Sequence, residues 1–170
     1  RYGPRATGAA PEATAALRRV VESFAASHSV DAELIFPLFE RALAFQASFM
    51  PALEGKARAL RRLHRLDEVT AVYHHIRSID PANAQAELNL AHHLLWLGNF
   101  EAGWKGREAR WRIPGLPISF PDGPGTVWLG EDDIAGKTIL IYSDEGLGDA
   151  IQFTRYVPML AERGARVVRG

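Results

Sequence analysis

Residues 53–81, LEGKARALRRLHRLDEVTAVYHHIRSIDP, decide the fold of this 170-residue chain. Small and apolar residues recur at intervals of three and four on both sides of a polar break at residues 65–67. This spacing is typical of two amphipathic helices joined by a tight turn. Pro51 suits a first helical turn, and Asp80 followed by Pro81 is expected to end the second helix. The stretch therefore predicts a helical hairpin.

The pattern of this hairpin repeats along the chain with a constant period. The aligned sets are Phe39, Tyr73 and Arg107; Ala42, Ile76 and Arg110; Ser23, Ala57 and Ala91; and Ala26, Leu60 and Leu94. Helix–turn–helix units that recur at about this interval, roughly 34 residues, are too thin to bury their apolar faces alone, so they must stack on one another. We expect helix over most of residues 13–113, in hairpins at about 16–49, 50–83 and 84–115, with further breaks at 27–31 and 98–99.

Local signals predict how several of these helices begin. Asp31 and Asp67 are expected to be N-caps, since a carboxylate accepts the unpaired amide protons of a first turn. Pro37 is expected to kink or delay the second helix of the first hairpin.

The hairpin at residues 53–81 resembles a tetratricopeptide repeat. The residues that carry the resemblance are Ala57, Leu60, Val69, Tyr73, Ile76 and Pro81. The third unit matches at Leu90, Ala91, Leu94, Gly98 and Phe100, and the first at residues 39–43. Arg107 and Arg110 depart from the pattern, because they stand where apolar residues are usual. The resemblance implies a mainly α protein: a tetratricopeptide-type α–α superhelix of two to three hairpins.

The rest of the chain has a different composition. Residues 1–12 are expected to form a flexible tail, and residues 114–130, rich in Pro and Gly, a linker. Residues 131–170 predict a partial α/β segment with a buried strand at 138–142, a loop at 144–149, a helix at 150–163, a C-cap at Gly164 and a second strand at 166–169. Strands joined in this way normally lie parallel.

Residues 89–168 resemble bacterial proteins in which tetratricopeptide repeats run into a two-lobed (GT-B) transferase similar to the O-GlcNAc transferases. The motifs are GNFEAGWKGREARWR (98–112), WLGEDDIAGKTIL (128–140) and DEGLGDAIQFTRYVPMLAERGARVV (144–168). The resemblance implies that residues 131–170 open an incomplete glycosyltransferase-like domain. The lobe that normally holds the nucleotide sugar is absent, so this chain alone is not expected to catalyse transfer, whereas a full-length protein could.

The first helices of tetratricopeptide arrays line a concave groove, and two stretches suit such a surface. We predict that it consists of Arg58, Arg61, Arg62, Arg65, Gln85, Leu88, Asn89, His92 and Trp96. Spacings of three, four and seven put the arginines on one helical face, where they suit an acidic peptide or a C-terminal carboxylate. The alternative is a solvated face whose arginines pair with Glu54 and Glu68. Asn89 matches a position in the asparagine ladder of the nucleocytoplasmic sugar transferases, but Gly55 stands at the preceding place.

A second candidate site is the glycine loop. Gly146, Gly148 and Asp149 lie between a predicted strand and a predicted helix, where backbone amides can hold an anion. In the resembled family this loop borders the cleft between the lobes. The alternative is a tight turn with an Asp N-cap.

Composition excludes several classes of function. Twenty basic residues balance twenty acidic ones, which argues against nucleic-acid binding. Cysteine is absent, which fits the cytoplasm, and no apolar run is long enough for a membrane span. The histidines do not have metal-ligand spacing, and we expect no metal or cofactor. We expect a protein or peptide partner, a nucleotide sugar only in a longer form, and a possible homodimer through an exposed strand edge.

Overall fold

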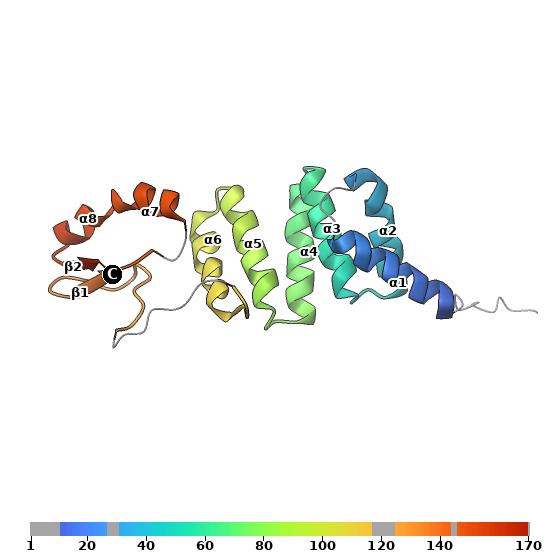
Figure 1. Cartoon of the computed structure of the whole chain (residues 1–170), viewed down its shortest axis with the longest axis horizontal. Helices are drawn as coiled ribbons and strands as arrows, with labels where there is room; N and C mark the ends of the chain where they lie inside the picture. Colours follow the sequence, from blue (N-terminus) through green and yellow to red (C-terminus); the bar gives the residue numbers. More distant parts are fainter. Residues whose placement is uncertain (1–10, 27–30, 117–124, 144–145, 170) are drawn as a thin grey trace, which may run out of the picture. The chain divides into compact units, whose positions relative to one another are not determined.

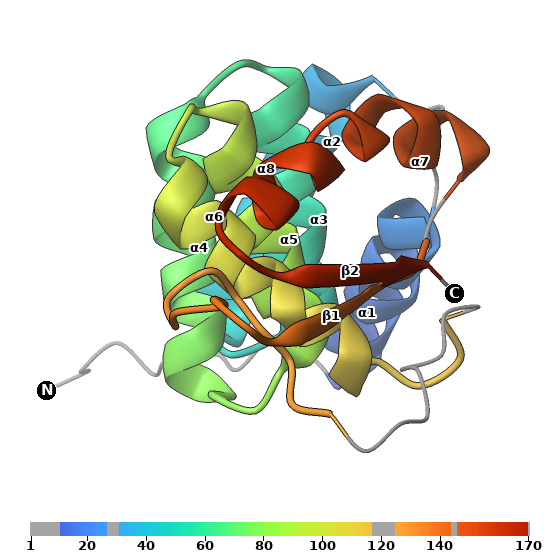
Figure 2. The ribbon, with the colours of Figure 1, turned by 90° about the vertical axis from the view of Figure 1, so that its left-hand side faces the viewer.

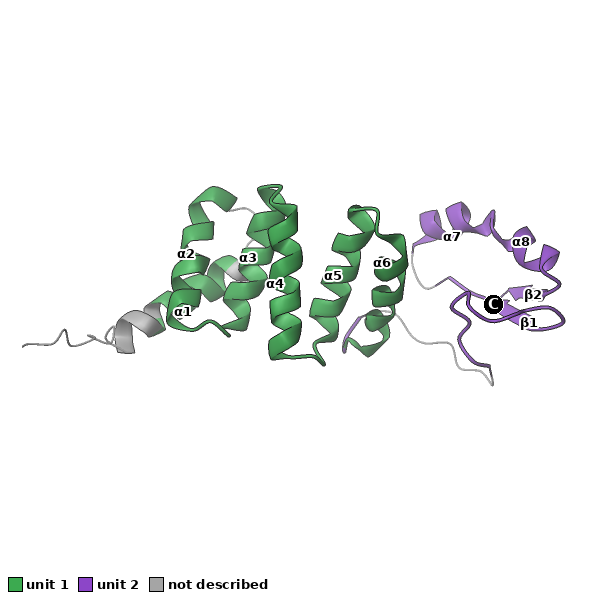
Figure 3. Ribbon diagram, turned by 180° about the vertical axis from the view of Figure 1, so that it is seen from behind, with its two compact units in different colours: residues 1–113 green, residues 114–170 purple. Residues whose placement is uncertain are grey.

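The computed structural model describes residues 11–26, 31–116, 125–143 and 146–169. The chain divides into two compact units, Arg1–Ile113 and Pro114–Gly170, which Figure 3 shows in different colours. Helices dominate the first unit, and the second holds a small parallel sheet. Parts of the expected tail, first break, linker and glycine loop lie outside the described residues, at 1–10, 27–30, 117–124 and 144–145.

The helices of the first unit follow a strict spacing in sequence. They are α1 (Pro11–Ala26), α2 (Ala32–Phe45), α3 (Met50–Arg62), α4 (Leu66–Ile79), α5 (Ala84–Trp96) and α6 (Phe100–Arg107), which runs into a 3₁₀ helix, η1 (Glu108–Arg112). Helices α2, α4 and α6 begin at positions 32, 66 and 100, and α3 and α5 begin at 50 and 84, so that each step equals the period seen in the sequence. The helices of each hairpin lie side by side (Figure 1). The predicted period is therefore confirmed in the backbone.

The turns within the second and third hairpins also repeat. The amide of Arg65 donates to the carbonyl of Leu60 at 3.0 Å, and one period later the amide of Asn99 donates to the carbonyl of Leu94 at 2.9 Å. Each turn passes through a left-handed residue, with φ of 56° at His64 and 82° at Gly98. The same backbone geometry is thus built once with glycine and once with histidine.

Two clusters of buried side chains hold the helices of this unit together. One consists of Leu53, Ala57, Leu60, Val69, Val72, Tyr73, Ile76, Ala86 and Leu90, from α3, α4 and α5. The other consists of Val21, Ala32, Ile35, Phe39, Ala42, Phe49, Ala52 and Ala59, from α1 to α3. Gly55 allows α2 and α3 to pack closely, because a Cβ atom there would lie 2.4 Å from Cε1 of Phe39. The apolar stripes are thus buried between successive hairpins, as expected of a stacked array.

The third hairpin presents polar side chains at the positions that bury apolar ones in the second. Tyr73 is 3% exposed and Ile76 is fully buried, whereas Arg107 and Arg110, one period later, are half-buried. Arg110 donates to Oε1 of Glu108 at 2.7 Å, and the indole of Trp111 donates to Oε2 of the same carboxylate at 3.0 Å. Polar outer faces are typical of the last unit in a stacked array.

One of the two predicted N-caps is present in the structure and the other is not. Asp31 caps α2 as predicted, because its carboxylate accepts from the amide of Glu33 at 3.0 Å. The prediction for Asp67 is wrong, since α4 begins at Leu66 and Asp67 lies in its first turn, where a negative charge favours the helix dipole. Pro37 lies inside α2 and does not delay it.

The second unit contains one βαβ element. Strands β1 (Thr138–Ile141) and β2 (Arg166–Arg169) pair in parallel, with Ile139 opposite Val167, which confirms the predicted orientation. Helices α7 (Leu147–Thr154) and α8 (Val157–Glu162) lie over one face of the pair (Figure 2). Gly164 has a φ of 83°, which fits its predicted place after the helix.

Two predictions for this unit are wrong. The helix expected at 150–163 is broken between Thr154 and Val157, because Pro158 has no amide hydrogen for a continuous helix and instead occupies the first turn of α8. The strand expected to be buried is partly exposed, with Leu140 at 49%, because helices cover only one face of the pair.

Candidate functional site

The arginines predicted for the groove separate into two groups. Arg61 and Arg62 are exposed in the last turn of α3, and Arg58 is half-buried one turn earlier. Spacings of three and four place these three arginines within one side of α3, next to the stripe that carries the buried Ala57 and Leu60. The structure therefore brings these three side chains to one face of α3.

Arg65 forms the second group, because it pairs with Glu68 in the first turn of α4. Its Nε and Nη2 atoms donate to the two carboxylate oxygens of Glu68 at 2.6 and 2.8 Å, and its guanidinium lies 4.7 Å from the centre of the Phe36 ring. The hydrogen bond from Arg65 lowers the pKa of the Glu68 carboxyl below its ordinary value. The sequence left two roles open for Arg65, a ligand contact or a pair with Glu68. The structure shows the pair with Glu68.

Helix α5 presents a polar and aromatic stripe. Gln85, Asn89, His92 and Trp96 follow one another at helical spacing and are exposed or half-buried. The amide of Gln85 donates to Oδ1 of Asn89 at 3.1 Å, so these two side chains orient each other. Leu88, in contrast, is only 8% exposed, so its side chain belongs mainly to the packing.

The place that corresponds to Asn89 in the preceding hairpin is closed to any side chain. Gly55 lies against the ring of Phe39, and even a methyl group there would overlap it. Packing between α2 and α3 therefore explains why the asparagine is not repeated.

Electrostatic interactions connect α3 with α5. Partial burial, followed by the positive charges of Arg107 and Arg61, lowers the pKa of His92. The charge of Arg61 therefore reaches the α5 stripe. Glu54, half-buried one turn before Arg58, is the acid on this side of α3. A surface of this kind favours a negatively charged ligand that also makes hydrogen bonds and aromatic contacts.

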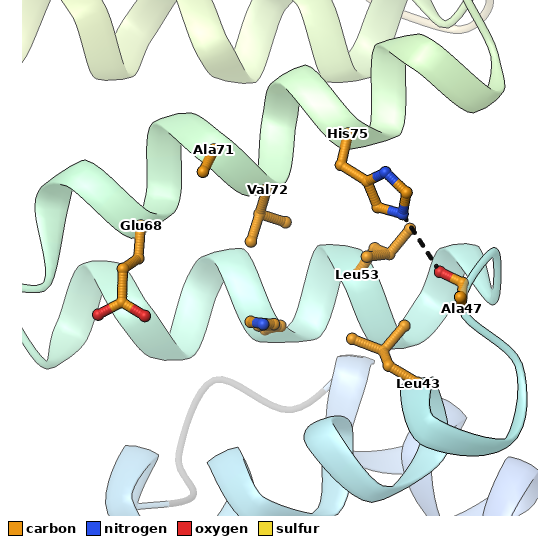
Figure 4. Close-up of a pocket in the computed structure, with 8 residues that line it drawn as sticks. Leu43, Ala47, Leu53, Glu68, Ala71, Val72 and His75 are labelled. Carbon is orange, nitrogen blue, oxygen red and sulfur yellow. Dashed lines mark hydrogen bonds between the residues drawn. The ribbon is translucent and has the colours of Figure 1, made fainter.

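A cavity that the sequence did not predict lies between α2, α3 and α4. It has a volume of about 360 Å³ and is lined by Leu43, Ala47, Leu53, Lys56, Glu68, Ala71, Val72 and His75 (Figure 4). Lys56 pairs with Glu40 at 2.6 Å, and Glu68 with Arg65, so the charges at the cavity are balanced. None of the predicted groove residues lines it. In the sequence, Leu43 and Val72 stand at apolar positions that indicate only burial in the core. Nothing in their local sequence indicates that they border a cavity.

In the second unit the residues of the glycine loop lie at the carboxyl end of β1. Gly146 precedes α7, and the amide of Asp149 donates to its carbonyl at 3.0 Å. Gly146, Gly148 and Asp149 are exposed. A cavity of about 310 Å³ lies between β1, β2, α7 and α8, and Tyr142, Ser143 and Arg169 are among its lining residues. The loop residues do not line this cavity.

The described residues provide neither a metal-binding cluster nor a helix that could span a membrane. Within them, no group of three or more His, Asp or Glu side chains is placed to hold a metal ion. None of the helices there has both the length and the apolar character that crossing a bilayer requires.

Comparison with known proteins gives one partial relationship. No family model matches the chain. The chain is similar to protein FlbA of Caulobacter vibrioides. The two share 34% identity over 74 residues, which is 41% of this chain and 11% of FlbA. The chain thus matches about a tenth of the length of FlbA.

Proposed function

We propose that this chain is a protein-interaction module of the tetratricopeptide type that binds an acidic peptide or protein segment over the exposed faces of α3 and α5. The observation that supports this most strongly is the register of the two helices. Arg58 and Arg62 on α3 stand one period before His92 and Trp96 on α5, so a cationic stripe and a polar, aromatic stripe occupy equivalent places in successive hairpins.

Physical chemistry favours an acidic peptide for such a surface. Guanidinium groups bind carboxylates through paired hydrogen bonds, and Arg61 and Arg62 present theirs at an exposed helix end. The amide groups of Gln85 and Asn89 can pair with the backbone of an extended segment. The excess of positive charge over the last two turns of α3 would speed association with an acidic partner and select against basic ones.

Calorimetric titration of the full chain with octaglutamate tests the proposal. We expect binding that weakens as salt is added, because exposed charges are screened over about 8–10 Å at physiological ionic strength. The double substitution R61E/R62E should weaken binding at least ten-fold. The control R19E/R41E makes the same change of net charge at exposed positions on α1 and α2 and should bind as the original chain does.

Helical content by circular dichroism should be equal in the two double variants. Equal affinity of both variants for octaglutamate would contradict the assignment of the site to α3, and absence of any binding by the original chain would contradict the acidic partner.

A second candidate function is the N-terminal part of a two-lobed glycosyltransferase that acts on protein or glycan acceptors with a nucleotide sugar. The parallel βαβ element favours it, since the carboxyl ends of parallel strands border ligand sites in open α/β sheets. The chain as it stands should give no heat with a uridine-diphosphate sugar, because one βαβ element offers no second lobe. Micromolar binding would contradict this division of roles.

A further inference from the structure

We propose that Trp96 is an apolar anchor within the acidic-peptide surface, so that the preferred partner carries a large aliphatic side chain among its acidic residues. This inference rests on the proposed function and specifies its ligand. It depends on three features of the α3–α5 surface: the exposure of Trp96, the backbone of His64, and the cationic groups beside them.

Trp96 is exposed but not isolated. Its side chain is 56% exposed at the end of α5, while the rings of His64 and His93 lie 6.4 and 6.5 Å from its ring centre. His93 is itself fixed, since its Nε2 atom lies 3.1 Å from both the carbonyl oxygen of Leu66 and the hydroxyl of Thr70. An indole that already has neighbours loses less freedom on binding than a mobile one.

His64 occupies a backbone conformation that glycine would adopt more easily. Its φ is 56°, and the corresponding residue in the next turn is Gly98, with a φ of 82°. A left-handed conformation is unfavourable for a residue with a side chain, because Cβ then lies too close to the backbone. A histidine at this place therefore indicates a use for its side chain, and the ring that it contacts is that of Trp96.

The apolar and cationic parts of the surface are continuous. Arg61 and Arg62 end α3 immediately before the turn that holds His64. On the other helix, His92 lies about one turn before Trp96 and is within reach of the charge of Arg61. An acidic segment bound at Arg61 and Arg62 therefore runs close to the indole of Trp96, whose exposed ring is suited to an aliphatic side chain.

Trp104 provides a matched control. It is 48% exposed on α6, close to the value for Trp96, but the guanidinium of Arg107 lies 5.5 Å from the centre of its ring. The ring of Trp104 already contacts a cation. We therefore expect that replacing Trp104 with alanine leaves the peptide affinity unchanged.

A leucine scan of octaglutamate tests the anchor. Eight peptides, each with leucine at one of the eight positions and glutamate elsewhere, are titrated calorimetrically into the full chain, together with octaglutamate itself. We expect at least one leucine position to bind about ten-fold more tightly than octaglutamate, although the peptide loses one charge. The variant W96A should bind all nine peptides equally well to within about two-fold, whereas W104A should retain the preference for leucine.

The outcomes separate the anchor from the wider surface. If octaglutamate binds but no leucine position improves on it, or if W96A keeps the preference, the anchor is overturned and the acidic surface stands. If R61E/R62E lowers affinity for every peptide and preserves the ratio between the best leucine peptide and octaglutamate, both the charge and the anchor are supported. If no peptide binds at all, the proposed function and the anchor both fail.

Discussion

The imidazole of His93 on α5 is held by the hydroxyl of Thr70 on α4, with Nε2 and Oγ1 3.1 Å apart. The same nitrogen lies 3.1 Å from the carbonyl oxygen of Leu66, while Nδ1 is buried and has no hydrogen-bond partner among the described residues. His93 is 1% exposed, at the junction of the second and third hairpins, and the corresponding residue of the preceding hairpin is Ala59. The junction thus contains a polar side chain that is bonded through one of its two nitrogens.

This arrangement predicts a loss of stability in acid. Burial lowers the pKa of His93 in the folded chain, because a charged imidazolium would lose its hydration there; the positive charge of Arg61 acts in the same direction, and the hydrogen bond to the carbonyl of Leu66 opposes both. The unfolded chain, with an ordinary histidine pKa near 6.5, then binds more protons than the folded chain at lower pH. The stability is therefore complete above about pH 6.5 and falls as the pH drops through the lower, folded-state pKa.

Thermal unfolding at pH 7.5 and pH 5.0 measures this effect. The midpoint should fall more in the original chain than in H93Q, whose side chain does not titrate. H92Q is the comparison, because His92 also has a lowered pKa but its side chain is exposed. The interpretation fails if H93Q loses as much stability in acid as the original chain does.

The contact of Gly55 with Phe39 predicts a strong effect of one methyl group. G55A would place a Cβ atom 2.4 Å from Cε1 of Phe39, so the helices must separate or the ring must move. Overpacking of this kind costs about 1–3 kcal/mol in the free energy of unfolding, measured by urea denaturation. The double variant G55A/F39L removes the obstructing ring atoms, and should be more stable than the sum of the two single changes predicts. Simple additivity of the two changes would be evidence against this contact.

The left-handed turn at His64 predicts a stabilising substitution. H64G should raise the free energy of unfolding by about 0.5–1 kcal/mol, because glycine adopts a φ of 56° without steric cost. At the equivalent turn, G98A should lower it by about 1 kcal/mol, since the methyl group has open space but the φ of 82° is unfavourable. Urea denaturation of both variants checks the pair, and a change of the same sign in each would refute the equivalence of the turns.

The polar face of the third hairpin predicts a change in association. Arg107 and Arg110 stand at the places of Tyr73 and Ile76, which bury their side chains between hairpins. The double variant R107Y/R110I should present an apolar face of the kind that stacks, and should self-associate as its concentration is raised, as measured by sedimentation velocity. The control R107Q/R110Q removes the same charges without adding apolar surface and should sediment like the original chain. Identical sedimentation of both variants would show that these positions do not limit stacking.

The sequence determined the features that arise locally. The repeat period, the helix cap at Asp31 and the turn at Gly98 depend on spacing and backbone preference, and all are readable before the chain folds. The helix start predicted from Asp67 is wrong by two residues, since the N-cap is Arg65, because capping preference alone does not fix which residue leaves the helix.

Only the tertiary structure decided which side chains remain on the surface. Arg58, Arg61 and Arg65 carry the same charge at helical spacing, yet packing turned Arg65 toward Phe36 and Glu68. Leu88 and His93 are buried although one was expected on the binding face and the other had no assigned place. The reason is physical: periodicity fixes the face of a helix that is apolar, but the positions of neighbouring helices fix which side chains of that helix meet water.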